Sequence, residues 1–366
     1  MNILINIAHP AQFHLYKFVA KNLIDNGHIV HIVLNSNKEI LLELLSGSGL
    51  PFVCLSSSKK RPKSILGRFF KLMLNDFRLI RFSYKNKIDL ITGSTVEVAH
   101  VSWFLRIFSI NTDDDDASVV PMYAATAGPF IQTSLAPMVC NNGFYEKKTI
   151  KYHGYHKLAY LHPKHFIPDI NIAAKYVSLE KNYFILRFSS LDAHHDHGVR
   201  GINNDFAEKL INYLLPNGNV YISSERNLSN ALEKYCLKIN VMDIHHVMAY
   251  ATILISDSQS MSHEAAMLGV PSIRYNDFAG RISVLEELEN KYHLTFAISP
   301  DQPESVFIRI SELLSYPILY DEFQYRRQLM LNDKIDVTSF FTWFIENYPR
   351  SKQIMKENPD YQYNFK

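Results

Sequence analysis

Residues 252–275 constrain the fold more than any other stretch of the sequence. They begin with a β-branched apolar run, residues 252–255, that is typical of a buried strand. A polar turn follows, then apolar residues at the spacing of one helix face, and Gly269 ends this helix before a second apolar strand at residues 272–275. Strand, helix and strand in this order predict a parallel α/β unit.

The turn between the first strand and the helix has the composition of an anion site. Asp257, Ser258 and Ser260 are residue types that cap helices, and the free N–H groups at a helix start attract phosphate together with the helix dipole. Glu264 lies one turn further along, close enough to bind a sugar hydroxyl beside that phosphate. An ordinary capped helix would show the same spacing, because caps are far commoner than ligand sites.

The string D-S-Q-S-M-S-H-E-A-A-M-L-G-V-P at residues 257–271 resembles the donor-binding motif of nucleotide-sugar enzymes with the GT-B fold. It is closest to the D-S-G-G-x-x-E-E-x-x-x-x-G-x-P motif of non-hydrolysing UDP-GlcNAc 2-epimerases, and more loosely similar to the E-A-A-x-x-G-x-P motif of MurG-like glycosyltransferases. The resemblance implies that Ser258 and Ser260 bind the donor pyrophosphate and that Glu264 binds the ribose. The two glycines of the motif are replaced here by Gln259 and Ser260. Gln259 is also expected to belong to the donor site.

Four further strings resemble an uncharacterised GT-B-like family of bacterial polysaccharide gene clusters. They are I-N-I-A-H-P-A-Q-F-H at residues 5–14, the Asp-rich residues 111–116, Y-H-G-Y-H-K-L-A-Y-L at residues 152–161 and L-R-F-S-S-L-D-A-H-H-D at residues 186–196. This resemblance covers most of the chain. It implies the α/β GT-B fold, in which two doubly wound Rossmann-like domains face a central cleft.

Strands and helices are predicted to alternate through both halves of the 366-residue chain, a length that suits two domains. Early strands are expected at residues 2–8, 28–34, 51–55 and 88–92. The Pro-containing residues 161–169 form the predicted linker. We therefore expect an acceptor-side domain at residues 1–165, a nucleotide-sugar-binding domain at residues 166–345 and a frayed polar tail at residues 346–366.

Composition favours a cytoplasmic protein. Lys and Arg number 38 against 36 Asp and Glu, and this net charge of +2 argues against nucleic acid as a partner. The three cysteines are scattered without a CxxC pair, which suits a reducing compartment. No signal peptide is predicted, and no apolar run reaches the roughly twenty residues that span a bilayer.

The loop after the first strand, residues 8–14, holds two histidines in place of the GxGxxG fingerprint of dinucleotide-binding domains. Ligands of parallel sheets bind beyond the carboxyl ends of the strands, where His9 and His14 would lie. We predict His9 as a catalytic base and His14 as an acceptor ligand. Helix capping or packing is the alternative for each.

Four aspartates follow one another at residues 113–116. Because like charges repel, at least one should have a raised pKa or a cation partner. For Asp113 and Asp116, a solvated turn that caps a helix from Ala117 is the simpler interpretation. In the resembling epimerases an acidic residue here faces the sugar, which implies Asp114 and Asp115 as catalytic candidates. A divalent cation has no second ligand cluster in the sequence to support it.

Two further segments contribute predicted site residues. Tyr152, His153 and Tyr155 belong to an aromatic string that would bind the acceptor sugar, or else line a domain interface. Arg187 is expected to clamp a diphosphate, and His194 to donate to it as the leaving group gains charge. A metal site is the alternative for this second loop, although adjacent loop ligands seldom form one. Its ligands would be Asp192, His194, His195 and His197.

Residues 59–87 hold ten basic residues against the single acid Asp76. The helix predicted here has an apolar face of Leu66, Phe69, Met73, Phe77, Ile80 and Tyr84. Another face carries Arg68, Lys71, Arg78, Arg81 and Lys85. We expect this basic face to meet an anionic membrane surface or a lipid pyrophosphate; a core helix with a solvated basic side is the alternative.

These features together predict an enzyme, a nucleotide-sugar-dependent glycosyltransferase of cell-envelope or capsular polysaccharide biosynthesis. It would use no metal and no cofactor, take a donor that is UDP-linked, and transfer to a polyprenyl-linked or glycan acceptor at the inner face of the cell membrane. A UDP-N-acetylhexosamine 2-epimerase is the first alternative, although residues 8–12 replace the G-T-R-P-E-like string of those epimerases. A non-catalytic nucleotide-sugar-binding protein is the second alternative.

Overall fold

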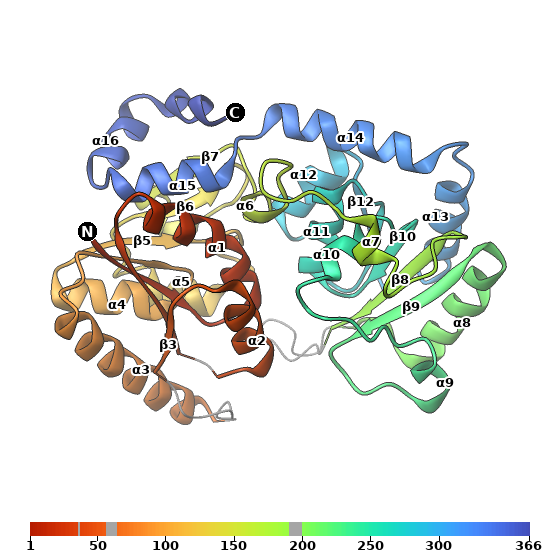
Figure 1. Ribbon diagram of the computed structural model, residues 1–366, viewed down its shortest axis with the longest axis horizontal. Helices are drawn as coiled ribbons and strands as arrows, with labels where there is room; N and C mark the ends of the chain where they lie inside the picture. Colours follow the sequence, from red (N-terminus) through yellow and green to blue (C-terminus); the bar gives the residue numbers. More distant parts are fainter. Residues whose placement is uncertain (36, 56–63, 190–199) are drawn as a thin grey trace. The chain divides into compact units, whose positions relative to one another are not determined.

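The computed structural model describes residues 1–35, 37–55, 64–189 and 200–366 (Figure 1). The chain divides into two compact units. Unit 1 comprises Met1–His165 and Lys334–Lys366, and unit 2 comprises Phe166–Asp333. The chain therefore leaves unit 1 inside the predicted linker, and it returns to unit 1 before its end.

Unit 1 contains a parallel sheet with the strand order β3-β2-β1-β4-β5-β6-β7. Its strands are β1 (Asn2–Ile7), β2 (Ile29–Leu34), β3 (Phe52–Cys54), β4 (Leu90–Gly93), β5 (Phe108–Thr112), β6 (Ser134–Pro137) and β7 (Thr149–Tyr152). The first four lie where the sequence predicts them. The last three were not predicted, because their short runs mix apolar residues with Ser, Thr, Asn, Lys and Pro. The strand order reverses between β1 and β4, and ligands of such sheets bind beyond the carboxyl ends at that point.

Helices cover the sheet of unit 1. They are α1 (Pro10–Asp25), α2 (Glu39–Ser48), α3 (Ile65–Lys85), α4 (Val96–Leu105), α5 (Pro121–Ala127), η1 (Gly143–Lys148), α6 (Leu158–Leu161), α15 (Val337–Glu346), α16 (Arg350–Glu357) and η3 (Pro359–Phe365). The helix expected from Ala117 begins four residues later, at Pro121. A turn comes first, because the N–H groups of Val119 and Val120 both donate to the carbonyl of Asp116.

The predicted apolar face of α3 does not pack on unit 1. Five of its six residues are between 53% and 81% exposed, and they are Leu66, Phe69, Met73, Phe77 and Tyr84. The buried positions are instead Asn75, Leu79 and Ser83. Four of the ten basic residues in the segment 59–87, at positions 59, 60, 61 and 63, lie outside the described residues.

The C-terminal segment is not a frayed tail, and residues 334–345 do not belong to unit 2. Helix α15 packs against α1 and α6, and α16 packs against β7. Met355 and Gln362 are buried, and Trp343 of α15 stacks on Tyr361 of η3 at 4.8 Å between ring centroids. Aromatic packing of this kind fixes a segment whose polar composition suggests disorder.

Unit 2 contains a second parallel sheet, with the strand order β12-β11-β10-β8-β9. Its strands are β8 (Tyr183–Phe188), β9 (Asn219–Ser224), β10 (Ile253–Ser256), β11 (Ser272–Tyr275) and β12 (Thr295–Ile298). Its helices are α7 (Ile170–Ala173), α8 (Asn204–Leu214), η2 (Leu215–Asn217), α9 (Asn230–Glu233), α10 (Ile244–Met248), α11 (Gln259–Leu268), α12 (Ser283–Asn290), α13 (Glu304–Leu314) and α14 (Leu319–Asp333). The unit β10-α11-β11 confirms the strand-helix-strand prediction, and Gly269 ends α11 in the left-handed conformation, with φ of 70°.

Candidate active site

Asp113, the first residue after β5, is buried against Tyr145 of η1 and is not part of a solvated turn. The Tyr145 hydroxyl donates to Asp113 Oδ2 over 2.7 Å, and the backbone N–H of Asp115 donates to Oδ1 over 3.3 Å. Burial raises the pKa of Asp113 to about 6; the bond from Tyr145 opposes this rise, and neighbouring Asp114 adds to it. A carboxyl group with this pKa changes protonation near neutral pH, which suits proton transfer.

Asp114 is contacted by a histidine and a lysine from the loop after β7. The Nδ1 of His156 lies 3.2 Å from Asp114 Oδ1, and the Nζ of Lys157 lies 3.8 Å from Asp114 Oδ2. Both side chains are buried, so their contacts with the carboxylate are weakly screened. His156 belongs to the aromatic and histidine string that was expected to bind the acceptor sugar, but neither residue was predicted to contact the aspartates. The available signal was the H-K pair at the centre of the string at residues 152–161.

Asp115 and Asp116 have different surroundings. Burial and the charges of Asp114 and Asp113 raise the pKa of Asp115 well above its ordinary value. Asp116 is buried, and its Oδ1 accepts a hydrogen bond of 2.7 Å from the backbone N–H of Asn141. Asp116 therefore holds the neighbouring loop at Asn141 in place. We call the other three residues, Asp113, Asp114 and Asp115, the carboxylate cluster. The expectation of a raised pKa or a cation partner in this run is therefore confirmed.

His9 caps α1, as the alternative interpretation of this residue expected. Its Nδ1 accepts a hydrogen bond of 3.2 Å from the backbone N–H of Ala11. A neutral imidazole that accepts at Nδ1 carries its proton on Nε2. In this neutral form the exposed His9 side chain can donate a hydrogen bond at the carboxyl end of β1, and its part as a catalytic base stays a prediction.

Two of the predicted acceptor ligands are wrong. Tyr152 and Tyr155 have no exposed surface. Tyr152 packs among His156 and Phe341, and the Nζ of Lys334 lies 4.4 Å from the ring centroid of Tyr155. These rings belong to the core that joins β7 to the C-terminal segment, so neither can stack on a sugar.

The other two predicted acceptor ligands also make packing contacts. His14 is 8% exposed, and its ring stacks on Tyr160 at 5.0 Å. His153 contacts the C-terminal segment, because its N–H donates to Gln362 Oε1 over 2.6 Å and its carbonyl accepts from the Ile335 N–H over 2.8 Å. Acceptor binding by His14 or His153 stays a prediction.

In unit 2, the start of α11 combines a structural carboxylate with an unsatisfied amide. Asp257 is buried, and its two oxygens accept from the N–H groups of Ser189 and Ile202 over 2.6 and 3.3 Å. Ser258 caps α11. Both polar atoms of the Gln259 side-chain amide are buried and make no hydrogen bond within the described part of the chain. Because buried polar groups are normally satisfied, this amide at the first turn points to a ligand.

Glu264 is buried in α11, one turn from the start of the helix. Its Oε2 is 3.4 Å from the Nε2 of His245 on α10, and about a tenth of the Glu264 side chain is exposed. His245 was not recognised in the sequence, although it stands in a D-I-H-H string shortly before β10. The pair fixes the position of the carboxylate predicted to bind ribose.

Arg187, the penultimate residue of strand β8, already has hydrogen-bonding partners. Its Nη1 donates to Ser223 Oγ over 2.9 Å, and its Nη2 pairs with Glu225. A diphosphate would have to compete with Glu225 for the guanidinium group, so the predicted clamp requires an exchange of partners. His194 and the rival metal ligands at residues 192, 195 and 197 lie outside the described residues.

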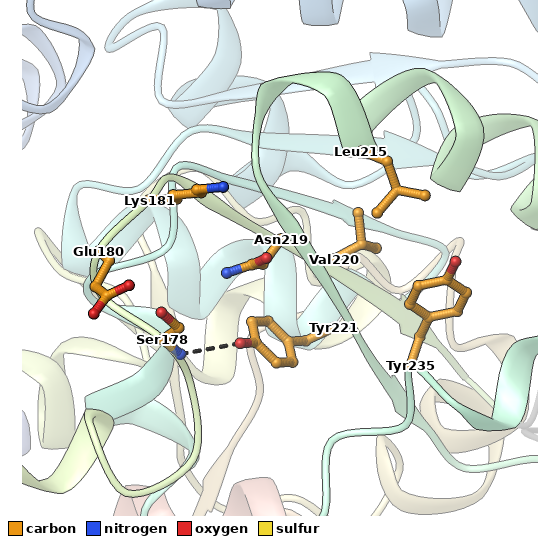
Figure 2. Close-up of a pocket in the computed structure, with 8 residues that line it drawn as sticks. All are labelled: Ser178, Glu180, Lys181, Leu215, Asn219, Val220, Tyr221 and Tyr235. Carbon is orange, nitrogen blue, oxygen red and sulfur yellow. Dashed lines mark hydrogen bonds between the residues drawn. The ribbon is translucent and has the colours of Figure 1, made fainter.

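A pocket of about 460 Å³ lies elsewhere in unit 2 (Figure 2). Lys181 and Asn219 line it, and they stand at the amino ends of β8 and β9. In Figure 2 the backbone N–H of Ser178 donates to the Tyr221 hydroxyl, over 3.0 Å. Ligands of parallel sheets bind at the opposite, carboxyl ends, where α11 starts. The candidate site therefore does not include this pocket.

No group of three or more His, Cys, Asp or Glu side chains in the described ranges could hold a metal ion. No helix that the structure describes is both long and apolar enough to cross a membrane.

Comparison of the whole chain with solved structures reveals its fold. S. aureus MnaA, solved with UDP, has a TM-score of 0.70 at 14% identity, over 96% of this chain and 97% of that chain. The chain has the GT-B fold. UDP-GlcNAc 2-epimerase from Neisseria meningitidis, bound to UDP-GlcNAc, has a TM-score of 0.62 at 13% identity, covering 91% and 99%. The glycotransferase of kitacinnamycin has a TM-score of 0.63 at 13% identity, covering 94% and 98%.

Sequence comparisons gave no relatives: no protein-family model matches the chain, and neither does any curated protein. The structural neighbours include glycosyltransferases and UDP-GlcNAc 2-epimerases, so the GT-B fold is compatible with both reactions. The function must accordingly be argued from the side chains of the site.

Proposed function

We propose that this protein is a nucleotide-sugar-dependent glycosyltransferase of cell-envelope or capsular polysaccharide assembly. In this proposal unit 2 binds the sugar donor, which is UDP-linked, and unit 1 binds the acceptor and supplies the base. The reaction uses neither a metal nor a cofactor. The observation that carries the proposal is the carboxylate cluster after β5, in which the pKa of Asp113 is about 6 and that of Asp115 is raised.

The donor site is assigned to the start of α11. The helix N-terminus, capped by Ser258, offers backbone N–H groups and a positive dipole end to the pyrophosphate. The unsatisfied Gln259 amide adds hydrogen-bonding capacity, and exposed Ser260 stands beside it. Glu264, held by His245, supplies a carboxylate for the ribose hydroxyls. As the bond to the sugar breaks, the same helix end stabilises the charge that develops on the departing nucleoside diphosphate.

The base is assigned to Asp115. A general base is most effective when its pKa lies near the working pH, and burial with two carboxylate neighbours raises the pKa of Asp115 in that direction. Asp115 would take the proton of the acceptor hydroxyl. At the same time the hydroxyl oxygen forms a bond to the anomeric carbon of the donor, and the donor's sugar–phosphate bond breaks. Asp114, held by His156 and Lys157, would orient the acceptor, and His9 would donate a hydrogen bond through Nε2.

A 2-epimerase acting on a UDP-N-acetylhexosamine is the second candidate. Carboxyl groups with raised pKa values are suited to removing and returning a proton at a sugar carbon, so the carboxylate cluster supports this reaction as well. The glycosyltransferase is preferred because residues 8–12 depart from the epimerase string and because the basic helix α3 suits a membrane-borne acceptor. We propose that this acceptor is polyprenyl-linked or a growing glycan, presented on the cytoplasmic side of an anionic membrane.

Product analysis separates the candidates. Purified protein would be incubated with a panel of nucleotide sugars, with and without a lipid-linked acceptor, and the products identified by mass spectrometry and NMR. Release of nucleoside diphosphate that requires the acceptor, with a glycosylated product, supports the transferase. An isomerised nucleotide sugar identifies the epimerase instead. Donor binding without any conversion would leave a non-catalytic binding protein.

A further inference from the structure

Helix α3 exposes a continuous apolar stripe. Six large apolar side chains between residues 66 and 77 are 47% to 72% exposed, and they are Leu66, Phe69, Phe70, Met73, Leu74 and Phe77. They recur at steps of one, three and four residues, so they lie along one side of the helix. A row of this kind on a protein surface marks a site that contacts another molecule or a membrane.

The opposite side of α3 is the side that packs on unit 1. Asn75, Leu79 and Ser83 are buried at four-residue steps. Asn75 donates to Glu97 of α4 over 3.0 Å, and Leu79 joins an apolar cluster that includes Val101. A helix held through this face turns its apolar stripe away from the unit.

Positive charge borders the stripe on one side. By the helical period, Lys71, Arg78 and Lys85 lie between the apolar stripe and the buried face, and Arg81 follows the stripe on the side nearest to them. The single acid of α3, Asp76, is directed to α4, where its Oδ2 lies 2.9 Å from His100 Nδ1. The free surface of α3 therefore has an apolar centre and a basic edge.

We propose that α3 lies in the plane of an anionic lipid bilayer, with the apolar stripe among the acyl chains and the basic edge at the phosphate headgroups. This is the geometry of an interfacial amphipathic helix, and long basic side chains can follow apolar surface while their charged ends reach the headgroups. Helix α4, which packs on α3, also carries exposed aromatic residues: Trp103 and Phe104 are 60% and 64% exposed, and such rings favour the membrane interface. A second copy of the chain fits less well, because a symmetric contact through this face would bring like charges together.

The inference extends the proposed function by naming the part of unit 1 that meets the acceptor's membrane. It also changes the salt dependence expected for membrane binding. Basic residues alone would give membrane binding that disappears as salt screens their charge. Inserted apolar side chains add a contribution to the binding free energy that salt does not screen.

Vesicle flotation with the full chain tests the proposal. The probes are phosphatidylcholine vesicles with and without phosphatidylglycerol, each at low and high salt. The triple variant Leu66→Ser, Phe70→Ser, Phe77→Ser should bind anionic vesicles at least tenfold less than wild type at both salt levels. The matched control, Ile308→Ser with Ile318→Ser, changes two side chains of unit 2 that are 60% and 62% exposed and should bind like wild type. All these side chains are exposed, so thermal stability should be unchanged in both variants.

Three results would overturn the inference: equal vesicle binding by wild type and triple variant, no vesicle binding by wild type, or self-association that the triple variant abolishes in sedimentation velocity. The last result would assign the stripe to a second copy of the chain. Calorimetric titration with UDP-GlcNAc reports on unit 2 alone. Intact nucleotide-sugar binding without vesicle binding would reject the membrane helix and leave the proposed donor site standing.

Discussion

The imidazole Nε2 of His165 donates a hydrogen bond of 2.8 Å to Asp336 Oδ1. These two residues stand where the chain leaves unit 1 and where it returns. Asp336 also caps α15, accepting from the N–H of Ser339 over 3.1 Å. One buried carboxylate therefore fixes both the start of α15 and its attachment to unit 1.

We expect Asp336→Ala to lower the free energy of unfolding by roughly 2 to 4 kcal/mol, the sum of a lost helix cap and a lost charged hydrogen bond. Burial by itself would raise the pKa of Asp336, but the bonds from His165 and Ser339 lower it to about 2. This contribution is present above the unfolded-state pKa near 4 and is lost as the pH falls through 2. Urea unfolding at several pH values measures it, with exposed Asp360→Ala as the control. A difference that persists undiminished at pH 2 would contradict the assignment.

Asp113→Asn should stabilise the protein at neutral pH. Burial raises the pKa of Asp113 to about 6, so the folded state binds the proton of this carboxyl group more tightly than the unfolded state does. The stability that this proton contributes is complete below about pH 4 and is lost as the pH rises through 6. Asparagine imitates the protonated form, so we expect a gain of about 1 to 3 kcal/mol at pH 8 and little difference at pH 4. Exposed Asp25→Asn serves as the control for surface charge. A gain that does not vary with pH would disprove the raised pKa.

Glu264→Ala should weaken nucleotide-sugar binding by roughly 1 to 3 kcal/mol, about 5- to 150-fold in affinity, because hydrogen-bonding groups of the ribose lose their partner. His245→Ala removes the contact that positions Glu264 and should have a smaller effect. Exposed Glu233→Ala on α9 of the same unit is the matched control. Isothermal titration calorimetry showing wild-type affinity for Glu264→Ala would remove this residue from the donor site.

Asp115→Asn should lower turnover at saturating donor about a hundredfold, the usual loss when a general base is removed, while donor affinity stays unchanged. Steady-state kinetics and calorimetry on the same preparation separate the two effects. Asp116→Asn is a suitable comparison, because Asp116 keeps a backbone contact through its Oδ1 and has no assigned part in proton transfer. Near-normal turnover of Asp115→Asn would place the base elsewhere in the carboxylate cluster.

His9 can be tested with one variant that keeps the helix cap and one that removes it. His9→Asn retains a capping acceptor, whereas His9→Ala should lose about 1 kcal/mol of stability. If the imidazole donates to substrate, both variants lose turnover to a similar extent, and only His9→Ala melts earlier. Full activity of His9→Asn would reduce His9 to a structural cap.

The sequence was sufficient to predict the structure where the signals are local. The β-branched run, the capping serine and Gly269 predicted β10-α11-β11 nearly to the residue, because each acts on the backbone conformation of its own neighbourhood. The carboxylate cluster was recognised for the same reason, as adjacent charges in one loop. Its contacts with His156 and Lys157 were not predicted, because these residues arrive through the order β5-β6-β7, and both pairings in that order join strands that were not predicted.

Helix α3 shows most clearly what only the tertiary structure decided. Periodicity predicted a helix with an apolar face and a basic face, and both are present. Periodicity cannot say which face packs, because burial depends on the surface that a neighbouring element offers. Here α4 presents Glu97 and His100, which bind Asn75 and Asp76, so the polar side of α3 turns inward and the apolar stripe outward. The sequence thus determined the residues of the amphipathic helix, and long-range hydrogen bonding to α4 determined the direction that its apolar side faces.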